Sequence, residues 1–305
     1  MRSRRTLFVI ASARALAAPP APSLYVVGCG VLGRATCRLW REQHPDAVII
    51  GETASTASHA ELERLGATPA TRSARGTQKC ANVFFCAPPS AYGDAEYAAE
   101  VAEAARACWD GAGSFLMASS GGVFAEDGGG VVDEAGGTLE TPRALKLLGA
   151  ERAALKAGGA VVRLAGLYTR DRGAHAYWYK RGTVEARGDG SLLNFLQYDD
   201  AAAFAKRALE ARVADEVLLA ADGSPRTRAG TVEAVARHPK FRDLAPPTFV
   251  AGETPPRRGP AGGGRVYDCS RSAARVGGWA PAFPSLDAFF ARDAEGPAEV
   301  ANRLP

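Results

Sequence analysis

The sequence predicts an α/β fold, in which a doubly wound parallel sheet is covered by helices and followed by a smaller C-terminal lobe. Short apolar segments alternate with helical segments along most of the chain, and glycines mark the turn after the first apolar segment. Such alternation is the order that builds a parallel sheet with helices on both faces. The expected strands are 24–27, 47–50, 82–86, 114–118, 160–164 and 216–220, and the expected helices are 32–40, 58–65, 94–108, 141–156 and one that Asp200 caps.

The turn after the first strand has the spacing Gly-x-Gly-x-x-Gly, a dinucleotide-binding fingerprint. Gly28 permits the sharp turn, Gly30 lets backbone approach a diphosphate, and Gly33 lets the helix lie close to the strand. The free N–H groups at the start of that helix favour an anion. The alternative is a tight turn that binds nothing. The segment expected to contact the dinucleotide comprises Gly28, Cys29, Gly30, Val31, Leu32 and Gly33.

The expected cofactor is NAD or NADP. Glu52 follows the second expected strand, where an acid binds the ribose hydroxyls of NAD and repels a 2′-phosphate. Arg34, with Thr53 and Ser55 nearby, suits NADP instead. A shift of one residue in the end of the strand reverses the argument, so both cofactors stay open. The other residues expected in the cofactor site are Thr53, Ala87, Pro88 and Ser119.

Composition and charge argue against several kinds of partner. The net charge of +4 is small for 305 residues, and the basic residues are scattered, so we expect no nucleic-acid partner. No run approaches the roughly 18 apolar residues needed to span a bilayer, so we expect no membrane partner. The six cysteines form no C-x-x-C pair, and we expect reduced core thiols and no metal site.

The first 22 residues resemble a targeting sequence. Arg2, Arg4, Arg5 and Arg14 occur in this segment, and the first acidic residue of the chain is Glu42. A basic, serine-containing, acid-free leader is typical of organelle transit peptides. We expect import into the plastid, with a mitochondrial or a cytoplasmic protein as the alternatives.

The expected domains are a dinucleotide-binding unit at 23–166 and a substrate lobe. The lobe would cover most of 167–305, from which a strand and a helix return to the main sheet. Residues 168–182 are rich in Arg, His, Tyr and Trp and are expected to line the cleft between the two parts. The Pro/Gly-rich run at 251–264 is typical of a loop or linker.

The segment FLMASSGGVFAED at 115–127 resembles the extended and atypical short-chain dehydrogenase/reductases, the NAD-dependent epimerase/dehydratase-like group. In that family a catalytic Ser or Thr lies four residues before the Tyr of a Val-Tyr-Gly triplet. Val-Phe-Ala stands in that place here, which puts Ser120 at the catalytic position. The alternative for Ser120 is a strand-end hydroxyl that caps a turn beside Gly121 and Gly122. The resemblance continues through VVRLAGLY at 161–168 and LNFLQYDDAA at 193–202, and it covers about 24–290. The phrase RLAGLYTRDRGAHAYWYKRG is most similar to a plant plastid subgroup of Rossmann-fold proteins.

One departure from the family concerns its Tyr-x-x-x-Lys pair, in which the Lys lowers the pKa of the Tyr that exchanges a proton with substrate. Alignment places Arg143 at the Tyr position and Leu147 at the Lys position. Arginine can stabilise an oxyanion but does not cycle a proton. A rebuilt relay could use Lys146 or His175; the alternative for His175 is a core histidine bonded to backbone.

The resemblance implies an NAD(P)-dependent oxidoreductase or epimerase-like enzyme that acts on a small molecule. The missing pair favours a second hypothesis, a catalytically inactive NAD(P)-binding scaffold or redox-sensing protein. Neither the substrate nor the oligomeric state can be predicted from the sequence.

Overall fold

A computed structural model describes residues 22–76, 78–186, 190–251 and 263–295. All but the last residue of the predicted transit peptide, and most of the predicted linker, lie outside these residues. Seven parallel strands form the main sheet, in the order β12-β7-β5-β4-β1-β2-β3. Their bounds are β1 Leu24–Val27, β2 Ile49–Thr53, β3 Thr68–Thr71, β4 Asn82–Phe85, β5 Phe115–Ser120, β7 Ala160–Leu164 and β12 Val217–Ala220. The predicted doubly wound α/β fold is confirmed.

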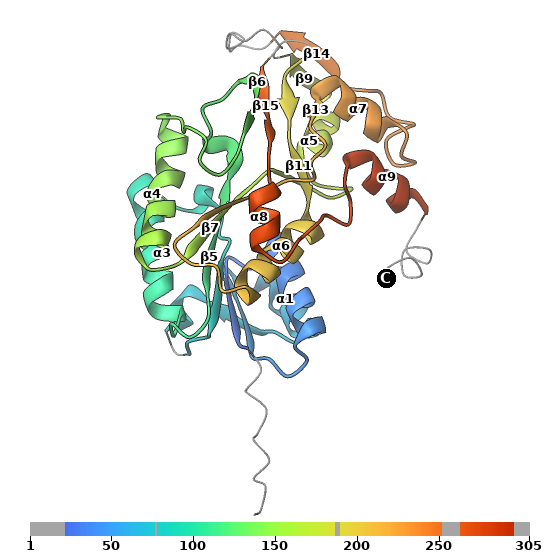
Figure 1. Cartoon of the computed structure of the whole chain (residues 1–305). Coiled ribbons are helices and arrows are strands. Elements are labelled where there is room, and N and C mark those ends of the chain that lie inside the picture. The colour runs from blue at the N-terminus through green and yellow to red at the C-terminus, as the bar shows by residue number, and fades with distance from the viewer. Residues whose placement is uncertain (1–21, 77, 187–189, 252–262, 296–305) are drawn as a thin grey trace, which may run out of the picture.

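Helices cover both faces of this sheet (Figure 1). α1 (Val31–Gln43) and α6 (Tyr198–Glu210) pack against one face, and α3 (Asp94–Cys108) and α4 (Pro142–Lys156) pack against the other. Alternate residues of a strand point to opposite faces, so Leu24 and Val26 join the α1 side while Tyr25 and Val27 join the α3 side. The sheet is therefore buried on both faces.

The second strand ends later than predicted, and the strand that follows it was not predicted. β2 extends to Thr53, so Glu52 lies inside the sheet, paired with Val27 of β1 and Ala70 of β3. β3 and the short helix α2 (His59–Arg64) complete that edge. An edge strand tolerates Pro69 because one side of it needs no ladder partner. All six cysteines are free thiols, as predicted, and four of them are buried.

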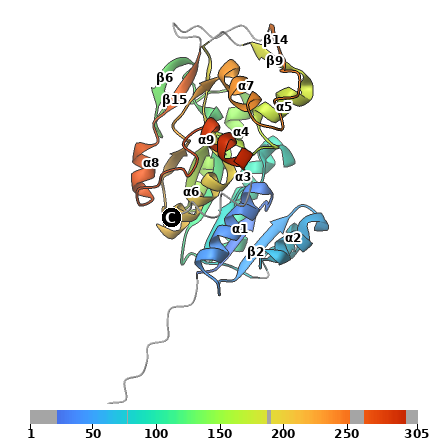
Figure 2. The same ribbon diagram turned by 90° about the vertical axis from the view of Figure 1, so that its right-hand side faces the viewer.

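The smaller lobe lies beyond the carboxyl ends of the main strands (Figures 1 and 2). It contains the sheet β13-β10-β15-β6 and the pairs β11-β8 and β14-β9. Its strands are β6 Gly128–Val132, β8 Gly166–Tyr168, β9 Thr183–Ala186, β10 Leu192–Leu193, β11 Phe195–Gln197, β13 Arg226–Thr227, β14 Thr248–Ala251 and β15 Gly264–Tyr267. Its helices are α5 Ala174–Arg181, α7 Arg228–Ala236 and α9 Leu286–Glu295, while α8 Ser270–Arg275 lies beside β12. β12 and α6 return to the main sheet, so the chain crosses between the two parts more than once.

Candidate functional site

Two glycines of the fingerprint are required by close packing. Gly28 has φ +79°, and a Cβ on it would lie 2.3 Å from the Cα of Ala87 at the end of β4. A Cβ on Gly33 would lie 2.8 Å from Cγ1 of Val26, which shows how closely α1 approaches β1. By contrast, a Cβ on Gly30 would meet no atom nearer than 3.9 Å. Packing therefore explains Gly28 and Gly33, whereas Gly30 faces open space.

The amino end of α1 lies at this open space. Gly30 is the N-cap residue, and no side chain caps the helix. The first N–H groups of a helix have no partner within the helix and carry its partial positive charge. An anion placed against Gly30 would therefore meet uncapped backbone donors.

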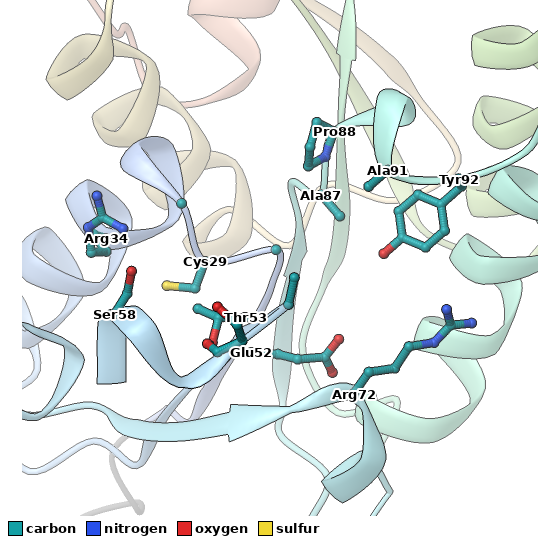
Figure 3. Close-up of a pocket in the computed structure, with 14 residues that line it drawn as sticks. Cys29, Arg34, Glu52, Thr53, Ser58, Arg72, Ala87, Pro88, Ala91 and Tyr92 are labelled. Atoms are coloured by element: carbon teal, nitrogen blue, oxygen red, sulfur yellow. The ribbon is translucent and has the colours of Figure 1, made fainter. Parts of the chain in front are cut away.

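A pocket of about 460 Å³ opens at the carboxyl ends of β1, β2 and β4 (Figure 3). In open α/β sheets, ligands bind at such strand ends. The geometry fits a dinucleotide, because bare backbone at Gly28 to Gly30 forms one wall and polar side chains continue beyond β2. The lining residues are Gly28, Cys29, Gly30, Arg34, Glu52, Thr53, Ala54, Ser55, Ser58, Arg72, Ala87, Pro88, Ala91 and Tyr92.

The Glu52 carboxylate is engaged inside the protein. Arg75 Nε donates to Glu52 Oε2 over 2.9 Å, Arg75 Nη2 donates to Oε1, and the Tyr25 hydroxyl donates to Oε2 over 3.0 Å. Arg75 also pairs with Glu100. Burial and the Glu52 charge together raise the pKa of Tyr25 well above its ordinary value. Glu52 lines the pocket but is 4% exposed, and its carboxylate already accepts from Arg75 and Tyr25, so the expectation that it serves a ribose stays a prediction.

Hydroxyl and guanidinium groups lie on the α1 side of the pocket. Figure 3 shows Arg34 and Ser58 on that side, and both line the pocket, while the Glu52 carboxylate points the other way, toward Arg72. Arg34 Nε lies 3.0 Å from Oε1 of Glu61, whose side chain is 45% exposed. Thr53 donates its hydroxyl to the Ser55 carbonyl over 2.8 Å. This end of the pocket therefore combines a guanidinium group with hydroxyl groups.

Ser119 and Ser120 point to different surroundings at the end of β5. The Ser119 hydroxyl donates to Oε1 of Glu151 over 2.5 Å, and Glu151 forms a buried ion pair with Arg163 at 2.8 Å. Ser119, expected in the cofactor site, is instead part of the α4 interface. Ser120 Oγ accepts a hydrogen bond from the Gly122 N–H over 3.1 Å. Its own proton remains available to another acceptor.

The other catalytic candidates do not converge on Ser120. His175 is fully buried between the rings of Phe241 and Phe290, its Nε2 lies 3.2 Å from the Arg170 carbonyl, and burial lowers its pKa. It is thus a core histidine, which corrects the expectation of a proton relay.

Helix α4 carries the remaining two candidates. Lys146 Nζ donates to the Tyr92 carbonyl over 2.6 Å and lies 3.3 Å from Asp94 Oδ1. It supports the loop that bears Tyr92, a pocket residue, but does not itself line the pocket. Arg143 is exposed and Leu147 is buried. No Tyr-x-x-x-Lys pair therefore occurs on this helix.

Several pocket residues were not predicted as site residues. Ser58, Arg72, Ala91 and Tyr92 belong to segments after β2, β3 and β4, and no motif marks them. Within the described part of the chain, no three His, Cys, Asp or Glu residues are placed to hold a metal ion. In the same residues, every helix is too short or too polar to cross a bilayer.

Comparison with known proteins shows likeness in structure alone. No protein-family model matches the sequence, and no curated protein matches it. A conserved protein of unknown function from Silicibacter pomeroyi has a TM-score of 0.69 and 19% identity, and the match covers 89% of this chain and 99% of that chain. The human epimerase family protein SDR39U1 with NADPH has a TM-score of 0.69 and 17% identity, covering 90% and 100%.

A third solved structure is UDP-glucuronic acid 4-epimerase from Bacillus cereus in complex with NAD. It has a TM-score of 0.67 and 14% identity, and the match covers 88% of this chain and 99% of that chain. At such low identity the likeness extends to architecture. The chain has the Rossmann-type α/β fold of these epimerase-like proteins.

Proposed function

We propose that this protein binds NAD or NADP in the pocket at the ends of β1, β2 and β4. The observation that carries the proposal is Gly30, an N-cap without a side chain, at the edge of a pocket of about 460 Å³. The amides from Gly30 to Gly33 would hold the diphosphate. The NAD and NADPH complexes of the structurally similar proteins support the same choice of ligand.

We further propose an oxidoreductase or epimerase-like activity on a small molecule held between the sheet and the smaller lobe. A nicotinamide coenzyme supplies hydride transfer when bound. Ser120, at the end of β5 with a free hydroxyl proton, would donate a hydrogen bond to a substrate oxygen. The reaction would proceed without the usual Tyr and Lys, because Arg143 and Leu147 occupy their positions.

A second candidate is an NAD(P)-binding protein without catalysis, acting as a scaffold or redox-sensing partner. The surroundings of α4 favour it, because Leu147 is buried, the Lys146 ammonium is bonded to the Tyr92 carbonyl, and His175 is in the core. Both candidates require coenzyme binding and differ only in turnover.

Coenzyme binding is tested by thermal unfolding with NADH or NADPH. A ligand at about 100 times its Kd stabilises the fold by about 2.7 kcal/mol, which corresponds to a rise in Tm on the order of 5 °C. Gly30→Ala should keep the Tm of the free protein, because its Cβ would meet no atom nearer than 3.9 Å, but should lose the coenzyme shift. The matched control is Gly137→Ala, at another exposed glycine, where an added Cβ would have nothing within 4 Å. No shift with either coenzyme would refute the proposal.

Turnover separates the two candidates. Wild-type protein and Ser120→Ala are compared on a panel of carbonyl compounds and nucleotide sugars. Both coenzyme oxidation or reduction and conversion of the substrate are measured, because an epimerase regenerates its coenzyme. An enzyme should show turnover that Ser120→Ala reduces at least about 100-fold, as for other catalytic hydrogen-bond donors. Coenzyme binding with no turnover across the panel supports the second candidate.

The plastid location and the likeness to a plant plastid subgroup are proposals that rest on the composition of the first 22 residues and on the phrase at 163–182. A fluorescent protein carrying residues 1–30 should enter chloroplasts. The same fusion with the four leader arginines changed to glutamate should stay outside. Mitochondrial or cytoplasmic fluorescence of the first fusion would support the alternatives.

A further inference from the structure

We infer that the pocket selects NADP(H) over NAD(H) by binding the 2′-phosphate between Arg34 and Ser58. The inference rests on the proposed function, since it assumes that a nicotinamide coenzyme occupies the pocket. It concerns the end of the pocket beyond β2, where the adenosine ribose lies in dinucleotide-binding sheets.

The carboxylate of Glu52 is already bonded within the protein. A ribose diol needs acceptors, and a carboxylate at the end of β2 supplies them in sites that bind NAD. Here Arg75 donates from two nitrogens to the two carboxylate oxygens of Glu52, and Tyr25 donates as well. Glu52 is 4% exposed and paired, so its carboxylate is not offered to a ribose diol. Its paired charge also repels a phosphate less than a free carboxylate would.

A guanidinium group and two hydroxyl groups line the pocket beyond β2. Arg34 lines it with a side chain that is 22% exposed, and its Nε lies 3.0 Å from Oε1 of Glu61. Within the described part of the chain, its two terminal amino groups form no hydrogen bond. The hydroxyls of Ser55 and Ser58 also line the pocket without a hydrogen-bond partner among the described residues. These groups match the acceptor oxygens of a phosphate.

Glu61 would compete with a bound phosphate for the guanidinium group of Arg34. The Glu61 carboxylate is half exposed and forms an ion pair with Arg34 at its Nε. An arginine can bind one anion through Nε and another through its terminal amino groups, because its five donors form a planar fork. Glu61 thus orients Arg34 toward the pocket but also offsets part of its charge. Removing that charge should strengthen phosphate binding.

The test is calorimetric or fluorescence titration of the full chain with NADPH and NADH. Titrations with 2′,5′-ADP and 5′-AMP compare the same site with and without the 2′-phosphate. NADPH should bind at least about tenfold more tightly than NADH, equivalent to about 1.4 kcal/mol. Arg34→Ala should abolish this ratio and leave NADH affinity within about twofold. Glu61→Gln should increase the ratio, which keeps the test valid even if the Arg34 variant folds poorly.

The matched control is Arg38→Ala, one turn further along α1. Arg38 pairs with Glu42 and Asp199 and does not line the pocket, so the ratio should stay unchanged. Equal or tighter binding of NADH overturns the inference while the proposed function stands. Equal weakening of both coenzymes by Arg34→Ala also overturns it. Failure of both coenzymes to bind refutes the proposed function itself.

Discussion

A buried carboxylate at the end of β12 should make the stability of this protein depend on pH. Asp222 is 6% exposed; its Oδ1 accepts the Ser224 N–H over 2.9 Å, and its Oδ2 has no hydrogen-bond partner among the described residues. Burial raises the pKa of Asp222 from 3.8 to about 7, an effect that the hydrogen bond from the Ser224 N–H and the nearby Arg226 partly oppose. The perturbation is Asp222→Asn, which keeps the acceptor at Oδ1 and removes the ionisation.

Proton linkage gives the direction in which the free energy of unfolding changes with pH. A carboxyl whose pKa is higher in the folded state binds its proton more tightly there, so its ionisation destabilises the fold. The free energy of unfolding therefore falls as pH rises from about 4 to about 7 and then levels off. Each pH unit in that window costs about 1.4 kcal/mol. Between pH 5 and pH 8 the wild-type protein should lose roughly 2–3 kcal/mol through this group.

Urea unfolding at pH 5 and pH 8 measures the effect. The free energy of unfolding of Asp222→Asn should change between these two pH values by roughly 2–3 kcal/mol less than that of wild type. Asp200, whose pKa burial also raises, acts in the same direction but is common to both proteins. Asp46→Asn, at an exposed carboxylate, is the control. Equal pH dependence in wild type and Asp222→Asn would refute the reasoning.

Three further substitutions test the site and its support. Gly28→Ala should destabilise the fold by at least about 2 kcal/mol, seen in thermal unfolding, because φ is positive and its Cβ would overlap backbone; an unchanged Tm would contradict this close approach. Glu151→Ala should lower the free energy of unfolding, measured with urea, by about 3–5 kcal/mol, because it leaves the charge of the buried Arg163 guanidinium unpaired. A decrease below about 1 kcal/mol would contradict the importance of this ion pair. Glu52→Gln should lower stability, because it weakens the pair with Arg75, but should leave the NADPH to NADH affinity ratio unchanged in titrations; a selective loss of NADH affinity would show that Glu52 binds ribose.

Sequence reasoning predicted the central strands and the turn because each depends on a local pattern. Val83 and Phe84 lie in an apolar run that only a buried strand accommodates, and Gly28 precedes a helix at the required spacing. The end of β2 was misplaced because Gly51 and Glu52 are not apolar. Glu52 can be buried in the sheet only because Arg75 reaches it from beyond β3, a contact that no local pattern reveals.

The site was only partly predictable for the same reason. The backbone wall of the pocket follows from the glycine spacing, whereas Ser58 and Arg72 arrive from segments whose path depends on the whole sheet edge. The burial of His175 was also not predictable, because its neighbours Phe241 and Phe290 lie 66 and 115 positions further along the chain. Contacts at such separations come from tertiary packing and cannot be inferred from spacing.

The hydrogen bond between Ser119 and Glu151 has a consequence for how this fold tolerates change. Neighbouring strand residues face opposite ways, so anchoring Ser119 to α4 also sets the direction of Ser120 at the rim of the sheet. That anchor lies two turns beyond Arg143 on the helix and takes no support from it. The position of Ser120 therefore does not depend on the side chain at position 143, and a change of that residue should leave the serine in place.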